Sequence, residues 1–298
     1  KKRLGDKRHH CGMIGDTPAM KTLFNTIEKV AEVSCSAIIT GDSGTGKELV
    51  AKALHDYSPR KDAPFVAVDC GALTTTLLES ELFGHEKGAF TGATQRKYGL
   101  MEQADGGTLF LDEICNISDT MQTKLMRALE SGNVTRVGAN TPVPVDVRVI
   151  AASNRNLEQM VEEGHLRHDF YHRLNVVNIN VPSLSQRRQD IPALVKAFVQ
   201  EFADRYSRQV QGYDNASLQR LCDADWPGNV RELRNTIERS VILAESSILS
   251  WEGMEPQKPD SQLPVRFSEE EFFSLNELEQ EYIHHVLRCF NGKKTKAA

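Results

Sequence analysis

The 298-residue sequence has no pair of cysteines with the spacing of a metal site or a redox site. Its six cysteines are scattered along the chain and none forms a C-x-x-C pair. This spacing argues against a zinc site and against a dithiol redox motif, and isolated cysteines are typical of a reducing cytoplasm. We therefore expect a cytoplasmic chain whose cysteines bind no metal.

Long apolar runs, a signal peptide and an excess of positive charge are also missing. No apolar stretch approaches the roughly 18 residues of a membrane-spanning helix, and the opening KKRLGDKRHH lacks the apolar core of a signal peptide. We interpret residues 1–11 as the remnant of a linker that follows a domain upstream. The 36 basic and 41 acidic residues give a net charge of −5, which argues against a nucleic-acid surface over the whole chain.

What the sequence does contain is an alternation of short apolar strands with amphipathic helices. A helix that starts at Asp16-Thr17-Pro18 precedes the first strand, and further helices are predicted over residues 47–57 and 118–130. The predicted strands cover residues 37–40, 65–68, 108–111, 145–152 and 176–181. This order predicts an α/β domain over residues 12–182 with a parallel sheet, in which ligands bind at the carboxyl ends of the strands.

The pattern changes after Pro182, where three helices follow one another and no strand is predicted between them. They cover residues 191–206, 216–224 and 229–244, and predict a small helical domain over residues 183–250. Residues 251–270 have the composition of a linker. A further amphipathic helix over residues 275–290 and a basic tail make up residues 271–298.

A glycine-rich loop follows the first predicted strand and runs into a helix. Its residues fit the pattern G-x-x-x-x-G-K: Gly41, Asp42, Ser43, Gly44, Thr45, Gly46 and Lys47. Glycines let backbone N–H groups turn inward around phosphate oxygens, and lysine and the helix N-terminus add positive charge. The pattern between a strand and a helix predicts a nucleotide-phosphate site. The next residue is Glu48, so the hydroxyl that usually binds magnesium here is absent.

Two carboxylates follow the third predicted strand and supply a second half of such a site. Asp112 is placed to hold magnesium directly or through water, and Glu113 to orient and deprotonate an attacking water. Asn154 follows the fourth strand, where it could contact the γ-phosphate or the water, although an Asn that only forms a turn is an alternative. These residues predict ATP and Mg²⁺ as substrate and cofactor.

The motifs in this order resemble those of the AAA+ ATPases, and in particular of the NtrC-like bacterial enhancer-binding proteins that activate sigma-54 RNA polymerase. The signature GAFTGA is spelled by Gly88, Ala89, Phe90, Thr91, Gly92 and Ala93. Further matches are GDSGTGKE, ADGGTLFLDE, LRHDFYHRLN and WPGNVREL, and the resemblance covers about residues 12 to 250. The chain looks close to the metal-responsive two-component regulators of this family. From the residues alone, GAFTGA is a mobile loop with an exposed apolar tip, or a hairpin that buries Phe90.

The resemblance implies roles for residues that the pattern alone would leave as surface charges or turns. Phe90 and Thr91 would touch sigma-54 while ATP hydrolysis raises and lowers their loop. Arg167 and Arg173 would be arginine fingers that reach the γ-phosphate bound by a neighbouring subunit, so activity would require a ring, hexameric or heptameric. The resemblance also makes Arg231 a sensor of nucleotide state in the helical domain, and places Ile14 and Gly15 in the adenine pocket.

One position departs from the pattern of the resembling family. The family usually has an Asn at the end of the second strand, which pairs with the catalytic glutamate and switches it off, whereas this chain has Asp69. An ionised Asp cannot donate to Glu113, and two close carboxylates would share a proton or repel. We therefore expect an altered switch, routed through water or another donor.

Residues 271–298 resemble the opening of a Fis-type helix-turn-helix domain and stop before a recognition helix, so we expect enhancer DNA to be bound by the complete protein.

Two alternatives to an ATP-driven activator stay open. One is a P-loop kinase of small molecules, which would leave GAFTGA and the arginine pair unexplained. The other is a regulator that binds nucleotide without turnover, against which the intact set of Lys47, Asp112 and Glu113 argues.

Overall fold

The fold is described from a computed structural model, for residues 9–10 and 12–251. The predicted linker from residue 252 onward and the predicted helix-turn-helix segment lie outside these residues. His9–His10 (β1) pairs antiparallel with Met13–Ile14 (β2), so two residues of the expected linker remnant belong to a small sheet.

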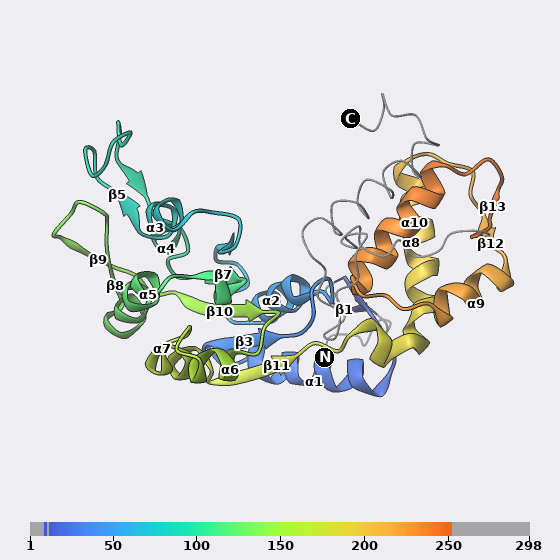
Figure 1. The fold of residues 1–298 in the computed structure, drawn as a ribbon, viewed down its shortest axis with the longest axis horizontal. Helices are drawn as coiled ribbons and strands as arrows, with labels where there is room; N and C mark the ends of the chain where they lie inside the picture. Colours follow the sequence, from blue (N-terminus) through green and yellow to red (C-terminus); the bar gives the residue numbers. More distant parts are fainter. Residues whose placement is uncertain (1–8, 11, 252–298) are drawn as a thin grey trace, which may run out of the picture. The chain divides into compact units, whose positions relative to one another are not determined.

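A five-stranded parallel sheet forms the centre of the α/β domain, in the order β11-β3-β10-β7-β4 (Figure 1). Its strands are β3 (Ala37–Thr40), β4 (Phe65–Asp69), β7 (Thr108–Asp112), β10 (Arg148–Ser153) and β11 (Val177–Asn180). Because β10 lies between β3 and β7, the carboxyl ends of these three strands meet at one edge of the sheet. This is the edge at which parallel sheets bind ligands.

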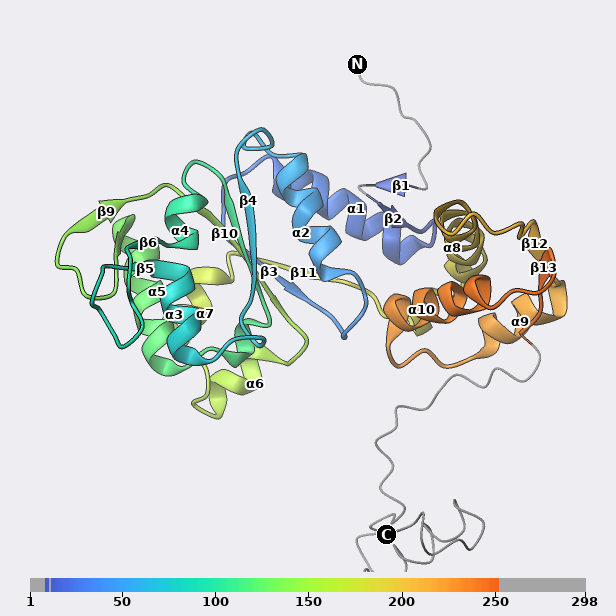
Figure 2. The same ribbon diagram turned by 90° about the horizontal axis from the view of Figure 1, so that it is seen from above.

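Successive residues of the central strands point to opposite faces of the sheet and enter two separate cores. Leu109 and Leu111 of β7 join one cluster, while Phe110 joins the other. The second cluster is covered by α1 (Pro18–Ala31) and α2 (Lys47–Asp56), which lie on one side of the sheet in Figure 2. Burial on both faces explains why these strands are continuous apolar runs.

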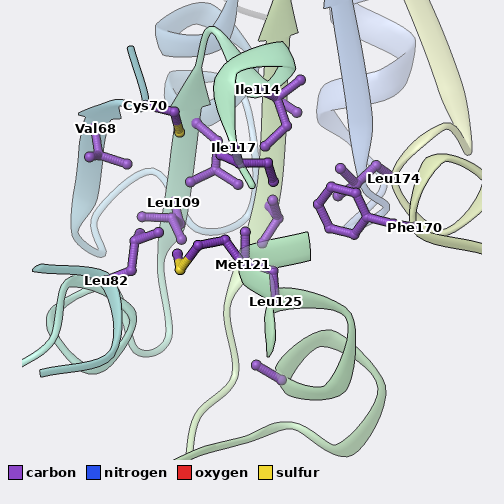
Figure 3. Packing of buried hydrophobic residues seen from close by; sticks show 14 of the residues in the cluster. Val68, Cys70, Leu82, Leu109, Ile114, Ile117, Met121, Leu125, Phe170 and Leu174 are labelled. Atoms are coloured by element: carbon purple, nitrogen blue, oxygen red, sulfur yellow. The ribbon is translucent and has the colours of Figure 1, made fainter. Parts of the chain in front are cut away.

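The opposite face of the sheet is covered by helices that contribute Leu82, Met121, Leu125, Phe170 and Leu174 to the first cluster (Figure 3). These helices are α3 (Thr75–Phe83), α5 (Asp119–Ser131) and α7 (His168–Leu174). Short helices α4 (Leu100–Gln103) and α6 (Leu157–Glu162), and the 3-10 turn η1 (Ile114–Asn116), connect them.

Two antiparallel ribbons leave this domain. One pairs β5 (Gly84–His85) with β6 (Lys97–Tyr98), and the other pairs β8 (Asn133–Thr135) with β9 (Pro142–Pro144). The first ribbon carries the GAFTGA segment. Backbone hydrogen bonds from Glu86 N to Val137 O and from Val137 N to Gly84 O hold the two ribbons together.

The helical domain begins with the 3-10 segment η2 (Leu184–Asp190) and continues with α8 (Ile191–Arg205), α9 (Asn215–Asp223) and α10 (Asn229–Ile242). Its core is built from all of these elements and includes Trp226 and Trp251. The three predicted helices are found within two residues of their expected ends. The expectation that no strand separates them is wrong, because β12 (Gly212–Tyr213) lies between α8 and α9 and pairs with β13 (Ile248–Leu249).

Trp251 extends the helical domain by one residue beyond the predicted boundary. Its backbone N–H donates to Ser217 Oγ and its indole N–H to Ser240 Oγ, both at under 3 Å, and the side chain is fully buried. An indole in such a position is part of a core and not of a linker.

Candidate nucleotide site

The glycine-rich loop connects β3 to α2 and takes a conformation that depends on its glycines. Gly44 and Gly46 have φ values of +77° and +103°, a region that side chains rarely adopt. A Cβ on Gly44 would also lie 2.2 Å from Gly228 O, so the loop needs glycine here to approach the helical domain. Thr45 closes the loop, because its hydroxyl donates to Asp42 O at 2.8 Å.

Lys47 is the first residue of α2 and lies almost fully buried inside this loop. Its Nζ donates to Gly41 O at 2.8 Å and to Asp42 O at 3.1 Å. Burial lowers the pKa of Lys47, and the carboxylates of Asp112 and Glu113 oppose that effect. The ammonium group therefore lies inside the loop, under the influence of Asp112 at the end of β7 and of Glu113 directly after it.

Asp112 ends β7, and Glu113 follows it in an unusual backbone conformation. Glu113 has φ 52° and ψ 46°, and its N–H donates to Asp112 Oδ1 at 3.0 Å. A non-glycine residue in the left-handed region costs about 1–3 kcal/mol and is concentrated at functional sites. Its carboxylate accepts a hydrogen bond from Asn116 Nδ2 at 2.8 Å, a contact that the sequence reasoning missed.

Asp69 does not take the position of a donor to Glu113. It ends β4 opposite Asp112, and its Oδ1 accepts from Gly71 N at 2.8 Å in a local turn. A Cβ on Gly71 would lie 2.5 Å from Glu113 Oε2 and 3.3 Å from Asp69 Oδ1, so the two carboxylates are close neighbours.

Two buried thiols accompany these carboxylates. Burial raises the pKa of Cys70 to about 12, and nearby carboxylates, first among them Asp69, add to the effect. Burial also raises the pKa of Cys115, which lies within 3.8 Å of Asn154 Oδ1. Both thiols are therefore protonated near neutral pH and add no negative charge to the site.

The helical domain contributes a second wall through the start of α10. Asn229 is buried with φ 52°; its Nδ2 donates to Ser43 O at 3.0 Å, and its Oδ1 accepts from Leu184 N at 2.7 Å. Arg231 donates from its backbone N to Gly44 O at 3.2 Å, and its guanidinium reaches Ser43 Oγ at 3.4 Å. Two side chains of α10 thus contact the loop that the sequence assigns to phosphate.

Arg187 is a further residue at this junction that the sequence reasoning did not single out. It is 4% exposed, and its guanidinium donates to Thr45 O at 3.2 Å, while its Nε has no hydrogen-bond partner. Burial lowers its pKa, which the charge of Asp190 opposes. Only the repetition of arginine in SQRRQ could have drawn attention to it.

These elements enclose a cavity of about 460 Å³. Its lining includes most of the predicted nucleotide residues: Ile14, Ser43, Gly44, Thr45, Gly46, Lys47, Glu48, Asp112, Glu113 and Arg231. Gly15 lies behind this wall, where a Cβ would lie 2.6 Å from Met20 Cγ and 3.0 Å from Asp190 Oδ2. The volume is in the range of small-molecule sites, and polar groups converge at one end.

Other predicted residues lie outside this cavity. Gly41, Asp42 and Asn154 line a neighbouring hollow of about 320 Å³. Arg167 caps α7 and pairs with Asp169 at 2.8 Å, and Arg173 donates to Leu129 O at 2.8 Å. Neither arginine lines the cavity of its own chain.

The GAFTGA segment forms a tight turn at the end of the first ribbon. Gly88 N donates to Ala93 O at 2.9 Å, and Ala93 N donates to Phe90 O at 3.0 Å. Thr91 and Gly92 are exposed, whereas Phe90 is half-buried with its ring edge-on to His85 at 5.0 Å between centroids. The aromatic group is therefore neither a free tip nor a core residue.

The residues present fit a magnesium ion that is held together with nucleotide phosphates. In the part of the chain that the structure describes, no group of three or more His, Cys, Asp or Glu side chains could hold a metal. Asp112 is nevertheless the strongest charge partner of Lys47 at the loop. One carboxylate plus phosphate and water oxygens is the usual donor set of magnesium.

Comparison with known proteins agrees with this geometry. Residues 13–180 match the Sigma-54 interaction domain, and residues 185–264 match the AAA+ ATPase lid domain. The transcriptional regulatory protein ZraR of Salmonella typhimurium is 49% identical over 287 residues, which cover 96% of this chain and 65% of that protein. The DNA-binding transcriptional regulator NtrC of Rhizobium meliloti is 41% identical over 289 residues, covering 96% and 60%.

A solved structure with the same fold contains the nucleotide. The structure of NtrX from Brucella abortus in complex with ATP has a TM-score of 0.75 and 36% sequence identity, and covers 96% of this chain and 65% of that one. The chain thus spans about two thirds of the length of these relatives. On the match over 13–180 and the lid that follows it, the chain belongs to the Sigma-54 interaction domain family of AAA+ P-loop proteins.

Proposed function

We propose that this chain hydrolyses ATP to ADP and phosphate and, as a ring, uses the turnover to remodel the closed complex of sigma-54 RNA polymerase. The observation that carries the proposal is the cavity in which the Gly41–Glu48 loop, Asp112, Glu113 and Arg231 come together. The volume of the cavity is in the range of small-molecule sites, and the relative NtrX has been solved in complex with ATP and with ADP.

The chemistry assigned to this chain is phosphoryl transfer to water. Lys47 and the loop N–H groups hold the phosphates, and Glu113 accepts a proton from a water whose oxygen attacks the γ-phosphorus. The bond from the γ-phosphorus to the bridging oxygen breaks, and ADP leaves with that electron pair. A magnesium ion held by Asp112 and the phosphates would neutralise negative charge in this step.

Ring formation would bring arginine side chains to a nucleotide site that contains neither Arg167 nor Arg173 of its own chain. Arg167, at the N-cap of α7, and Arg173, within α7, are exposed and do not line the cavity of their own chain. We assign them to the γ-phosphate of the neighbouring subunit, where an arginine is worth about 10³-fold or more in rate. A hexamer or heptamer then provides one complete site at each interface.

The GAFTGA turn is assigned to sigma-54, with Phe90 and Thr91 as its contacts. Asn154, directly after β10, would contact the γ-phosphate or the attacking water, and Arg231, on α10, would link the nucleotide state to the position of the helical domain. Enhancer DNA would be bound by the segment after residue 270 in the complete protein.

We place the protein in the cytoplasm, since Cys35, Cys70, Cys115 and Cys222 are free thiols. Among the residues that the structure describes, no helix is long and apolar enough to cross a bilayer.

The decisive experiment measures ATP turnover against protein concentration, with and without sigma-54. We expect turnover per chain to rise with concentration, and Glu113→Gln to lower kcat by about 10²-fold or more while ATP still binds. Glu162→Gln, at an exposed position of α6, is the matched control. Turnover that is independent of concentration would rule out the ring, and full activity of Glu113→Gln would rule out the assigned base.

The assignment to sigma-54 is tested separately by capture in the presence of an ATP transition-state mimic. Phe90→Ala is expected to abolish capture and to leave ATP turnover within about twofold of wild type, because Phe90 contacts His85 and not the cavity. Tyr98→Ala removes an exposed aromatic from the same ribbon as a control. Turnover of the wild type without capture of sigma-54 would refute the activator function.

A further inference from the structure

Glu113 has a hydrogen-bond donor on its own turn. The 3-10 turn η1 begins directly after Glu113, and Asn116 N donates to Glu113 O at 3.0 Å. Residues three apart in a 3-10 turn are eclipsed, which brings the Asn116 amide next to the Glu113 carboxylate. The resulting contact, Asn116 Nδ2 to Glu113 Oε2 at 2.8 Å, is charge-assisted and leaves Oε1 available to a water.

The orientation of the Asn116 amide is defined by Glu113 on one side and Cys115 on the other. Glu113 can only accept, so the NH₂ group must face it, and Asn116 Oδ1 then faces the Cys115 thiol at 3.8 Å. The same thiol lies 3.8 Å from Asn154 Oδ1 at the end of β10. A row of polar contacts thus links Glu113 through Asn116 and Cys115 to Asn154, a candidate contact of the γ-phosphate.

The neighbouring strand β4, which ends at Asp69, provides no side-chain donor to Glu113. The Asp69 side chain has no N–H donor, and its Oδ1 already accepts a hydrogen bond from Gly71 N at 2.8 Å. Gly71 has an ordinary negative φ, yet a Cβ there would lie 2.5 Å from Glu113 Oε2 and 2.7 Å from Asn116 Nδ2. Glycine at this position therefore leaves the space that the Glu113–Asn116 pair occupies.

We propose that Asn116 is the positioning residue of Glu113 and supplies the amide hydrogen bond that Asp69 cannot supply. The inference rests on the proposed ATPase function. Asn116 holds one carboxylate oxygen, so that the other points to the water that attacks the γ-phosphorus, and it touches neither nucleotide nor water itself. A base whose orientation is fixed by a third group is a general feature of activated sites.

The test compares Asn116→Ala and Asn116→Asp with wild type in steady-state ATP hydrolysis. We expect kcat to fall about tenfold in Asn116→Ala and further in Asn116→Asp, which keeps the shape but replaces the donor by a second carboxylate. KM for ATP should stay within about twofold, because the Gly41–Glu48 loop is untouched. Asn215→Ala and Asn215→Asp, at an exposed position at the start of α9, are the matched controls.

Two further variants test the space that Gly71 leaves for the Glu113–Asn116 pair and whether Asn116 acts only through Glu113. Gly71→Ala should lower kcat as Asn116→Ala does, whereas Gly212→Ala, where a Cβ meets nothing within 4 Å, should have no effect. In a Glu113→Gln background, Asn116→Ala should cause no further loss, because a residue that acts only through Glu113 has nothing left to position.

The outcomes separate the two proposals. Wild-type kcat in Asn116→Ala, a change in KM alone, or an undiminished loss in the Glu113→Gln background would overturn the inference and leave the ATPase function standing. A wild-type chain that binds ATP without turnover would overturn the proposed function, and the inference with it.

Discussion

At the scale of single residues, Asp69 is the substitution with the sharpest consequence. Its carboxylate accepts from Gly71 N and lies next to Glu113 and Asn116. Asp69→Asn would keep the acceptor oxygen and add an amide donor beside Glu113. We expect basal ATP turnover to fall several-fold and its response to sigma-54 to increase, because Glu113 would then be shared between two donors.

This expectation is checked by turnover assays of Asp69→Asn with and without sigma-54, with Asp62→Asn, at an exposed position before β4, as the control. If both the rate and the response to sigma-54 are unchanged, the hypothesis of an altered switch at this position is wrong. If Asp69→Asn also makes turnover insensitive to Asn116→Ala, the two amides act on the same carboxylate.

Some site residues could be predicted because the sequence alone constrains them, and others could not. Asp112 ends β7, Glu113 follows it directly, and Lys47 ends the glycine-rich loop that follows β3, so strand prediction also places their side chains at one edge of the sheet. Asn116 was missed because its role depends on the positive φ of Glu113 and on a three-residue turn, neither of which the letters DEICN indicate. Arg187 was missed because its partners, Met20 and Thr45, lie 167 and 142 residues away in the chain.

At the scale of elements, the contact between α10 and the phosphate loop depends on Asn229. This residue joins Ser43 O to Leu184 N with one side chain and has the left-handed φ that glycine tolerates. Asn229→Gly keeps the backbone and removes both bonds. Because a buried N–H without a partner costs about 1–3 kcal/mol, we expect the melting temperature to fall by a few degrees and Kd for ATP to rise several-fold.

Thermal unfolding and equilibrium binding of a fluorescent ATP analogue measure these two effects. The reference is Asn133→Gly, since Asn133 also donates to a backbone oxygen but begins β8 and does not line the cavity. An Asn229→Gly chain with wild-type affinity for the analogue would show that the link between α10 and the loop does not influence nucleotide binding.

The long elements were predictable, and the short ones were not. The central strands β3, β7 and β10 are buried on both faces, whereas the edge strands β4 and β11 are partly exposed. Each of the five strands is found within three residues of its predicted ends. The two-residue strands β5, β6, β12 and β13 have no periodicity to detect, and their pairing is fixed by tertiary contacts. Helix α3 was also not predicted, because its sequence TTLLESELF has no regular apolar stripe.

At the scale of the whole molecule, the prediction that subunits share the site came only from the family resemblance. Arg167 and Arg173 lie outside the cavity of their own chain, and Arg167 pairs with Asp169 on the same helix. A single chain therefore gives no geometric reason to link α7 with the phosphate loop. The link requires a second copy whose α7 faces the cavity.

The shared site predicts that two inactive variants restore each other. Glu113→Gln has an intact α7 and no base, whereas Arg173→Ala has an intact base and lacks one candidate finger. In a mixed ring with random order, about a quarter of the interfaces combine the intact Glu113 of one chain with the intact Arg173 of its neighbour. We expect an equimolar mixture to regain ATP turnover of up to about a quarter of the wild-type rate, measured at a concentration at which the wild type is fully assembled. The double variant Glu113→Gln/Arg173→Ala mixed with wild type is the control for assembly. A mixture of the single variants that stays as inactive as its components, although it assembles, would show that Arg173 does not act in the site of a neighbouring chain.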